Sequence, residues 1–466
     1  MKEISGKTPL VLKLDESDIQ GPLRIRVRSF TETVSMNHAI HPELDIHPLE
    51  DPYPVKFTKE DCRKKIVLVP NTSHAFCRIM SAAMRGQHIQ AEPLEIGREE
   101  AIRLGKQYVH NDICFPCQIV IGEALAALKS GKYDGKEVAI GMGKYIGDCR
   151  LTHYSALLRK ALDDAGFHDV PILTNDDVDY HNMHPGFRMS LGSAIRLAFA
   201  LPVIDVLEEL LRKIRPYEKE AGSTNRAFEK GMDAIVEGLE LHGISGLKKG
   251  FKMAIDLMNQ VKYDRTNRRP RVLIVGEYLL NFHPGANHDI EDYLEHNGFE
   301  IIEAHMTDVI QKSYFYLDAQ IKEYKLKKPL NKKIWFSTVD TVFDMAHNMA
   351  DAIAKKHPLY TPACRMPDLV KASDPIINHT FDAGEGVLIP GEILHHAKDG
   401  CRSFVILQPF GCLPNHIVGK GVIKELRKSY PESNIIAVDY DPGASEVNQL
   451  NRIKLMLSTA NKNLKK

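Results

Sequence analysis

The chain has 466 residues, of which 43% are hydrophobic and 26% are charged, and its formal net charge is +0. At roughly 100–200 residues per domain, this length allows two to four domains with buried cores. A balanced charge argues against nucleic acid and an anionic membrane as partners, because both bind basic surfaces. The N-terminus is too charged for a signal peptide, and no apolar run approaches the roughly 18 residues of a membrane span. We therefore expect a cytoplasmic protein.

Residues 1–60 carry many prolines and show little periodicity. We predict an extended N-terminal arm with short strands for this segment. The runs Leu10–Leu14 and Arg24–Phe30 alternate apolar and polar residues, which is typical of edge strands.

From residue 61 to residue 190, short apolar runs alternate with segments of helical spacing. We expect strands at Lys64–Pro70, Ile89–Glu95, Glu137–Gly143 and Val170–Asp176, and helices at Phe76–Gly86, Ile119–Tyr133 and Ser155–Phe167. Such alternation is typical of βαβ units, so residues 61–190 are predicted to form a first Rossmann-like lobe with a parallel sheet.

Residues 191–265 lack strand signals and predict a helical segment. Residues 266–466 return to the alternating pattern and predict a second Rossmann-like lobe with a helical insertion around 305–380. Its expected strands are Arg271–Glu277, Glu300–Met306, Arg402–Phe410 and Asn434–Asp441. The predicted fold class is therefore α/β, with two Rossmann-like parallel-sheet lobes and helical segments between and beside them.

Three of the eight cysteines occupy equivalent places in this pattern. Cys114 precedes an expected helix, whereas Cys149 and Cys412 each follow an expected strand. Loops at the carboxyl ends of parallel strands form the ligand crevice of such folds. Helix N-termini there favour the thiolate, which is the form that binds soft metals and iron–sulfur clusters. These three cysteines are therefore candidate ligands of a soft metal or an iron–sulfur cluster, and buried packing is the alternative that their position leaves open.

The other candidate residues carry weaker signals. Cys117 forms a C-x-x-C with Cys114, which also fits a thioredoxin-like dithiol, whereas a zinc site would need a second closely spaced pair. The run GMGKYIG matches neither phosphate-loop pattern, so we expect no ATP site in this chain. Packing is the ordinary role of the remaining cysteines, Cys62, Cys77, Cys364 and Cys401. Six histidines could bind a metal or move protons, although loop histidines are usually just solvated: His181, His184, His283, His288, His395 and His396.

Several runs of this sequence together resemble one family. They include NDICFPC, GDCRLTHY, RPYEKEAGSTNRAFEK, GEYLLNFHPGANHDIEDYLEHNGFEII and LQPFGCLPNHIVGKGVIKELRKSYPESNIIAVDYDPGASEVNQLNRIKLML. The chain resembles the C-terminal portion of large CoA-substrate-specific enzyme activases, a portion related to 2-hydroxyacyl-CoA dehydratases. The resemblance covers most of residues 60–460 and is strongest at 380–460.

This resemblance implies a [4Fe–4S] cluster between two lobes, held by three cysteines with one iron site open. Carried over to this sequence, the three ligands are Cys114, Cys149 and Cys412. Cys117 stands where the family pattern ND-x-C-x-P-S has serine, and as a fourth ligand it would close the open site and favour pure electron transfer. Related proteins carry a double-cubane cluster instead.

The resemblance also implies a function. We expect the iron–sulfur component of an ATP-dependent low-potential reductase or 2-hydroxyacyl-CoA dehydratase-like system. The chain lacks the ATPase portion of the fusions, so a separate ATP-hydrolysing activase would supply the electron, and a second dehydratase-like subunit and an acyl-CoA substrate are expected partners. Two alternatives stay open: a non-enzymatic electron-transfer or scaffold subunit of a larger complex, and a zinc-stabilised α/β protein.

Overall fold

Contacts within the computed structural model divide the chain into two units, Met1–Pro54 and Val55–Lys466. The structure describes residues 20–40, 55–110, 112–144, 149–174, 184–187, 189–327, 330–381, 383–441, 443 and 446–464.

The described part of the first unit is the helix α2 (Gln20–Ile40). The prediction of an edge strand at Arg24–Phe30 was therefore wrong, because this run lies inside α2. A short alternating run also fits a helix when apolar residues recur every three or four positions. They do so here, at intervals of four, three and four residues, at Leu23, Val27, Phe30 and Val34. The run Leu10–Leu14 lies outside the described residues.

The first sheet of the second unit contains four parallel strands in the order β2-β1-β3-β4. The strands are β1 (Ile66–Val69), β2 (Ala91–Pro93), β3 (Val138–Gly141) and β4 (Ile172–Leu173). The central strands β1 and β3 are almost wholly buried, as the continuous apolar runs predict for a sheet covered on both faces.

The second sheet repeats this arrangement in the order β6-β5-β7-β8, again with parallel strands. Its strands are β5 (Arg271–Gly276), β6 (Glu300–Glu303), β7 (Ser403–Pro409) and β8 (Asn434–Tyr440). In both sheets the first strand in sequence lies between the second and the third. The predicted α/β class with two Rossmann-like parallel-sheet lobes is thereby confirmed.

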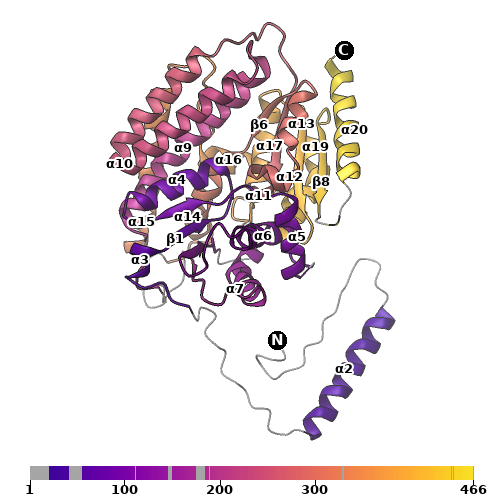
Figure 1. The fold of residues 1–466 in the computed structure, drawn as a ribbon. Coiled ribbons are helices and arrows are strands. Elements are labelled where there is room, and N and C mark those ends of the chain that lie inside the picture. Colours follow the sequence, from indigo (N-terminus) through magenta and orange to yellow (C-terminus); the bar gives the residue numbers. More distant parts are fainter. Residues whose placement is uncertain are drawn as a thin grey trace. The chain divides into compact units, whose positions relative to one another are not determined.

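Helices accompany each sheet. Those of the first lobe are α3 (Asp61–Lys64), α4 (His74–Arg85), α5 (Glu99–Tyr108), α6 (Phe115–Lys129), η1 (Arg150–His153) and α7 (Tyr154–Asp164). Those of the second lobe are α11 (Tyr278–Phe282), α12 (Pro284–Asn287), α13 (Ile290–His296), α17 (Leu388–Lys398), α18 (Leu413–Asn415), the π-helical turn η3 (His416–Lys420), α19 (Ile423–Ser429) and α20 (Glu446–Leu464). Helix α20 packs on the outer strand β8 (Figure 1).

Two long helices, α9 (Leu191–Ile214) and α10 (Ser223–Gln260), follow the first sheet and lie side by side (Figure 1). The short turn η2 (Arg215–Tyr217) joins them. Within α10 the backbone bends at Gly243, whose φ of 57° is a conformation that glycine adopts without strain. The segment between β6 and β7 adds α14 (Met306–Glu323), α15 (Leu330–Ala354) and α16 (Met366–Ser373), and α15 packs against α9.

One hydrophobic core joins the two lobes. It contains residues of α6 such as Ile121 and Leu125 together with residues of the second sheet and its helices such as Ile274, Leu280 and Val405. The two sheets are therefore held in a fixed relation by shared apolar packing. In the part of the chain that the structure describes, no helix combines the length and the apolarity that crossing a membrane requires.

Candidate iron–sulfur site

Cys114 is the residue that immediately precedes α6, and Pro116 lies in the first turn of this helix. Proline is favoured at that position because its missing N–H would have no partner there. The Cys114 side chain is 5% exposed, and its Sγ lies 3.0 Å from the hydroxyl oxygen of Tyr154. The start of α6 thus presents a buried thiol that already has a hydrogen-bond partner.

Cys149 precedes the short turn η1 and is half-buried. Its Sγ accepts a hydrogen bond from the backbone N–H of Leu151 at 3.4 Å. Residues 145–148, which connect β3 to this turn, lie outside the described residues. The thiol therefore follows the carboxyl end of β3, as the sequence predicts.

Cys412 follows the carboxyl end of β7 and precedes α18. The residue before it, Gly411, has a φ of 75°, where glycine is strongly favoured. A Cβ built on Gly411 would lie 3.6 Å from the backbone nitrogen of Cys114. The β7 loop of the second lobe therefore lies directly against the start of α6 in the first lobe, which brings two of the predicted ligands together.

Electrostatics place Cys117 and Cys149 in the same neighbourhood. Burial, followed by repulsion from Cys114, raises the pKa of Cys117 well above its usual value, and Cys149 contributes to the same shift. Burial also raises the pKa of Cys149 to about 12, with repulsion from Cys114 as a smaller cause. The pKa of Cys412 is raised by burial, then by two glutamates, and also by Cys149. The structure therefore gathers all four predicted cysteines into one group, which we call the four-thiol site.

Two buried glutamates line this site, and the sequence alone did not point to them. Glu277 follows β5 and caps α11 by accepting the N–H of Leu280 at 2.9 Å. Glu385 accepts the backbone N–H of Tyr278 at 3.2 Å and the side-chain amide of Asn415, also at 3.2 Å. Each carboxylate lies at a loop of the second lobe beside the Cys412 segment.

Burial, followed by repulsion from Glu385, raises the pKa of Glu277 to about 8. Burial also raises the pKa of Glu385. At neutral pH this pair therefore keeps at least one proton next to the thiols. A signal for Glu277 was available in the sequence, because it is the last residue of a predicted strand, and parallel sheets present ligand-binding groups at the carboxyl ends of their strands.

The chemistry of these residues fits an iron–sulfur cluster. Thiols are the donors that such clusters use, and Cys114, Cys149 and Cys412 stand at loops where backbone N–H groups can donate to sulfur, whereas Cys117 lies in the first turn of α6. Backbone N–H groups of Cys117 and Asn415 lower the pKa of Cys114 and Cys412 respectively, against the larger effect of burial. Burial disfavours the charged forms of these thiols and carboxyls, which is why their pKa values are raised. A cationic iron core would stabilise the thiolates by compensating their negative charge.

The remaining cysteines have separate surroundings. The Cys77 thiol is fully buried and donates to the carbonyl of Pro70 at 3.2 Å, and Cys401 contacts the carbonyl of Ser403 at 3.4 Å. Cys62 and Cys364 are half-buried. Neither Cys77 nor Cys401 contributes to the pKa shifts of the cysteines in the four-thiol site.

Among the candidate histidines, His283 has the most defined environment. Its Nε2 lies 2.7 Å from Glu123 of α6, and both side chains are wholly buried. Its Nδ1 accepts the backbone N–H of Ala286 at 3.0 Å, so the proton sits on Nε2 and is donated to the carboxylate. This histidine therefore joins the two lobes.

The other candidate histidines that the structure describes have partners of their own. His184 accepts the backbone N–H of Phe57, and His288 stacks on Tyr440. His395 and His396 lie with Asp399 at the end of α17, close enough for one metal ion, although these side chains are half-exposed or exposed. His181 lies outside the described residues.

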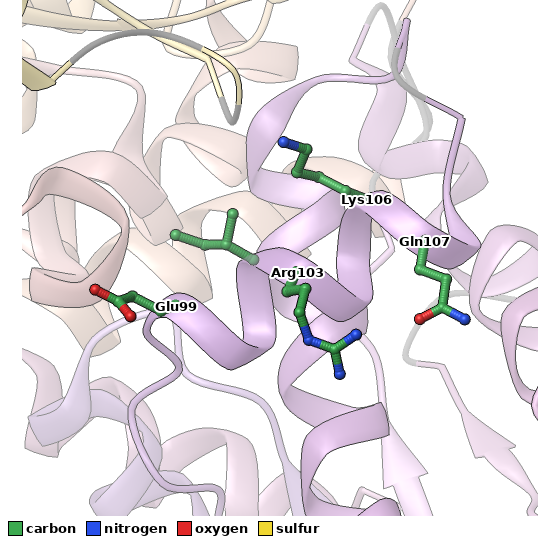
Figure 2. A pocket seen from close by; sticks show the side chains of 5 residues that line it. Glu99, Arg103, Lys106 and Gln107 are labelled. Carbon is green, nitrogen blue, oxygen red and sulfur yellow. The ribbon is translucent and has the colours of Figure 1, made fainter.

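A surface hollow of about 500 Å³ lies along α5 (Figure 2). Its lining comes from one face of that helix: Glu99, Ile102, Arg103, Lys106 and Gln107. The hollow is open and mostly charged, and it includes none of the four thiols. We therefore place the candidate site at the cysteines rather than here.

No protein-family model and no curated protein sequence matches this chain.

Proposed function

We propose that this chain is the iron–sulfur component of an ATP-dependent low-potential reductase or 2-hydroxyacyl-CoA dehydratase-like system, working in the cytoplasm and receiving electrons from a separate activase. The observation that supports the proposal is that the Cys412 loop of the second lobe lies against the start of α6 at Cys114, and that Cys149 interacts electrostatically with both of these cysteines. The resemblance of the cysteine-containing runs to dehydratase-related modules supports the same assignment. A second dehydratase-like subunit and an acyl-CoA substrate belong to this proposal.

In this proposal Cys114, Cys149 and Cys412 hold a [4Fe–4S] cluster. When bound, the cluster supplies one-electron chemistry at low potential. The protein contributes burial, which keeps water from the thiols, and hydrogen bonds to sulfur from Tyr154 and the Leu151 N–H. Glu277 holds a proton beside the thiols at neutral pH, because burial raises its pKa to about 8.

A specific observation also favours the second candidate function, a non-enzymatic electron-transfer subunit. Cys117 is wholly buried and is repelled by both Cys114 and Cys149, so its thiol stands near the other ligands. Ligation by Cys117 would close the fourth iron site and leave no position for a substrate. Cys117→Ser separates the two functions: unchanged cluster content and spectrum favour the open site, whereas loss of the cluster favours electron transfer alone.

The experiment that tests the proposed function is a redox titration of anaerobically prepared protein followed by EPR. We expect the signal of a reduced iron–sulfur cluster that forms only at low potential. A colourless protein that contains zinc and stays EPR-silent on reduction would contradict the proposal and support the zinc-stabilised alternative.

The hydrogen bond between Tyr154 and Cys114 gives a finer prediction. A donor to a cluster sulfur stabilises the more negative, reduced state, so its loss lowers the reduction potential. We expect Tyr154→Phe to keep its iron and to shift the potential downward by roughly 20–60 mV, the equivalent of one hydrogen bond. Tyr133→Phe is the matched control, since the Tyr133 hydroxyl bonds Glu92 on the surface of the same lobe. If Tyr154→Phe, Tyr133→Phe and the unaltered protein have equal reduction potentials, the Tyr154 hydroxyl does not donate to a cluster ligand.

A further inference from the structure

The C-terminal half of α17, together with the residue that follows it, places four metal-binding side chains along one face of the helix. They are Glu392, His395, His396 and Asp399. Their spacing of i, i+3, i+4 and i+7 is that of neighbours on a helix surface. Imidazole and carboxylate groups are the ligands that bind zinc and related divalent metals in proteins.

Two of these histidines and one carboxylate lie within reach of a single ion. One ligand atom from each of His395, His396 and Asp399 lies within 4.8 Å of the other two. The Nε2 of His395 is 3.7 Å from a carboxylate oxygen of Asp399. Nitrogen and oxygen donors around a tetrahedral zinc, with bonds of about 2.1 Å, are roughly 3.4 Å apart. Small side-chain rotations would therefore complete the geometry.

Glu392 supports this group from the buried side of the helix. Its side chain is 8% exposed, and its Oε2 lies 3.4 Å from the Nε2 of His396. Metal-binding histidines commonly direct their second ring nitrogen at a carboxylate, which fixes the orientation of the ring. Residues 388–394 of α17 are all buried, so the ligands stand on an anchored helix.

The charges at this end of α17 favour a cation. Each carboxylate pairs with a histidine, and in the part of the chain that the structure describes neither Glu392 nor Asp399 forms an ion pair with a lysine or an arginine. When the imidazoles are neutral, two negative charges stand at a helix C-terminus, where the helix dipole is also negative. A divalent cation would compensate these charges.

We propose that His395, His396 and Asp399 bind one divalent first-row metal ion, for which Zn²⁺ is the probe. Glu392 orients His396, and water takes the remaining position, which the partly exposed ligands leave accessible. The site precedes β7, whereas Cys412 follows this strand, whose seven residues span roughly 20 Å. The ion would therefore be separate from the four-thiol site, and the inference does not depend on the proposed function.

The test measures the zinc bound to the full chain by equilibrium dialysis against buffered Zn²⁺, followed by elemental analysis. One variant, His395→Gln with His396→Gln, removes both imidazoles. A second, Asp399→Asn, replaces a carboxylate that is 56% exposed by an amide of nearly the same shape. This second variant keeps the proposal testable if the double variant fails to fold, which circular dichroism would reveal.

The matched control is His168→Gln with His242→Gln. His168 also lies beside a carboxylate, at 3.4 Å from Asp163, but this pair belongs to no set of three ligands among the described residues. X-ray absorption at the zinc edge separates the proposed site from the four-thiol site. Zinc bonds to nitrogen and oxygen are about 2.0–2.2 Å long, whereas those to sulfur are about 2.3 Å.

We expect the unaltered protein and the control to bind one zinc ion more than the double variant of His395 and His396. Asp399→Asn should bind this ion at least about tenfold more weakly. The ion that the variants lose should have only nitrogen and oxygen ligands. Equal zinc content and affinity in the unaltered protein and either variant would overturn the proposal. Sulfur ligands around the lost ion would also overturn it, by placing that zinc at the cysteines.

Discussion

Replacing either Cys149 or Cys412 by alanine is expected to abolish cluster assembly. In the proposed site each of these cysteines supplies a ligand from a different lobe, and the Cys149 thiol contributes to the raised pKa of Cys412. With only two of the three ligands left, iron would be open to solvent on the side of the missing cysteine. We expect iron and acid-labile sulfide to fall to background in both variants after anaerobic reconstitution.

The matched control is Cys77→Ala. Cys77 is also a buried thiol, but its partners are the Pro70 carbonyl and the Thr72 N–H. This variant should keep its full complement of iron. Full iron in both Cys149→Ala and Cys412→Ala would show that the ligands have been assigned to the wrong residues.

The second large effect concerns stability. Glu123→Ala is expected to lower the free energy of unfolding by about 3–5 kcal/mol, because it leaves two buried donors and one part-buried donor without an acceptor. These donors are the backbone N–H groups of Asn71 and Gly97 and the Nε2 of His283, at 3.0, 2.6 and 2.7 Å from the carboxylate. Since His283 belongs to the second lobe, the two lobes should also separate more easily. Urea denaturation followed by fluorescence measures the change.

Glu100→Ala is the control for this measurement. Glu100 forms an ion pair with Arg103 on α5, but both side chains are largely exposed, and such pairs add little to stability. Its denaturation midpoint should match that of the unaltered protein. A Glu123→Ala midpoint that also stays unchanged would contradict the role assigned to the contact between Glu123 and His283.

Much of the fold of the second unit could be predicted, because short apolar runs mark its strands and helical spacing marks many of its helices. The apolar runs at Ile66–Val69 and Ser403–Pro409 are strands in both prediction and structure, and the helices end at or near the predicted glycines. The elements that were missed or misassigned include α5 and α2. The helix α5 has only three buried residues, which leaves a weak apolar period, and Arg24–Phe30 alternates like a strand while lying in α2.

The candidate site was predictable in part, for a similar reason. Cys114, Cys149 and Cys412 stand at helix starts and strand ends, and these positions are visible in the sequence. Glu385 was not, since it joins the site through contacts with Tyr278 and Asn415, 107 and 30 residues away. Long-range pairs of this kind depend on how the loops of the second lobe pack together, which periodicity does not encode.

The proposed cluster on Cys114, Cys149 and Cys412 is tested most directly by the iron and acid-labile sulfide content of protein purified without oxygen. We predict about four irons and four sulfides per chain, whereas about eight irons would indicate the double-cubane type. Protein that contains neither iron nor sulfide after reconstitution would contradict the presence of a cluster.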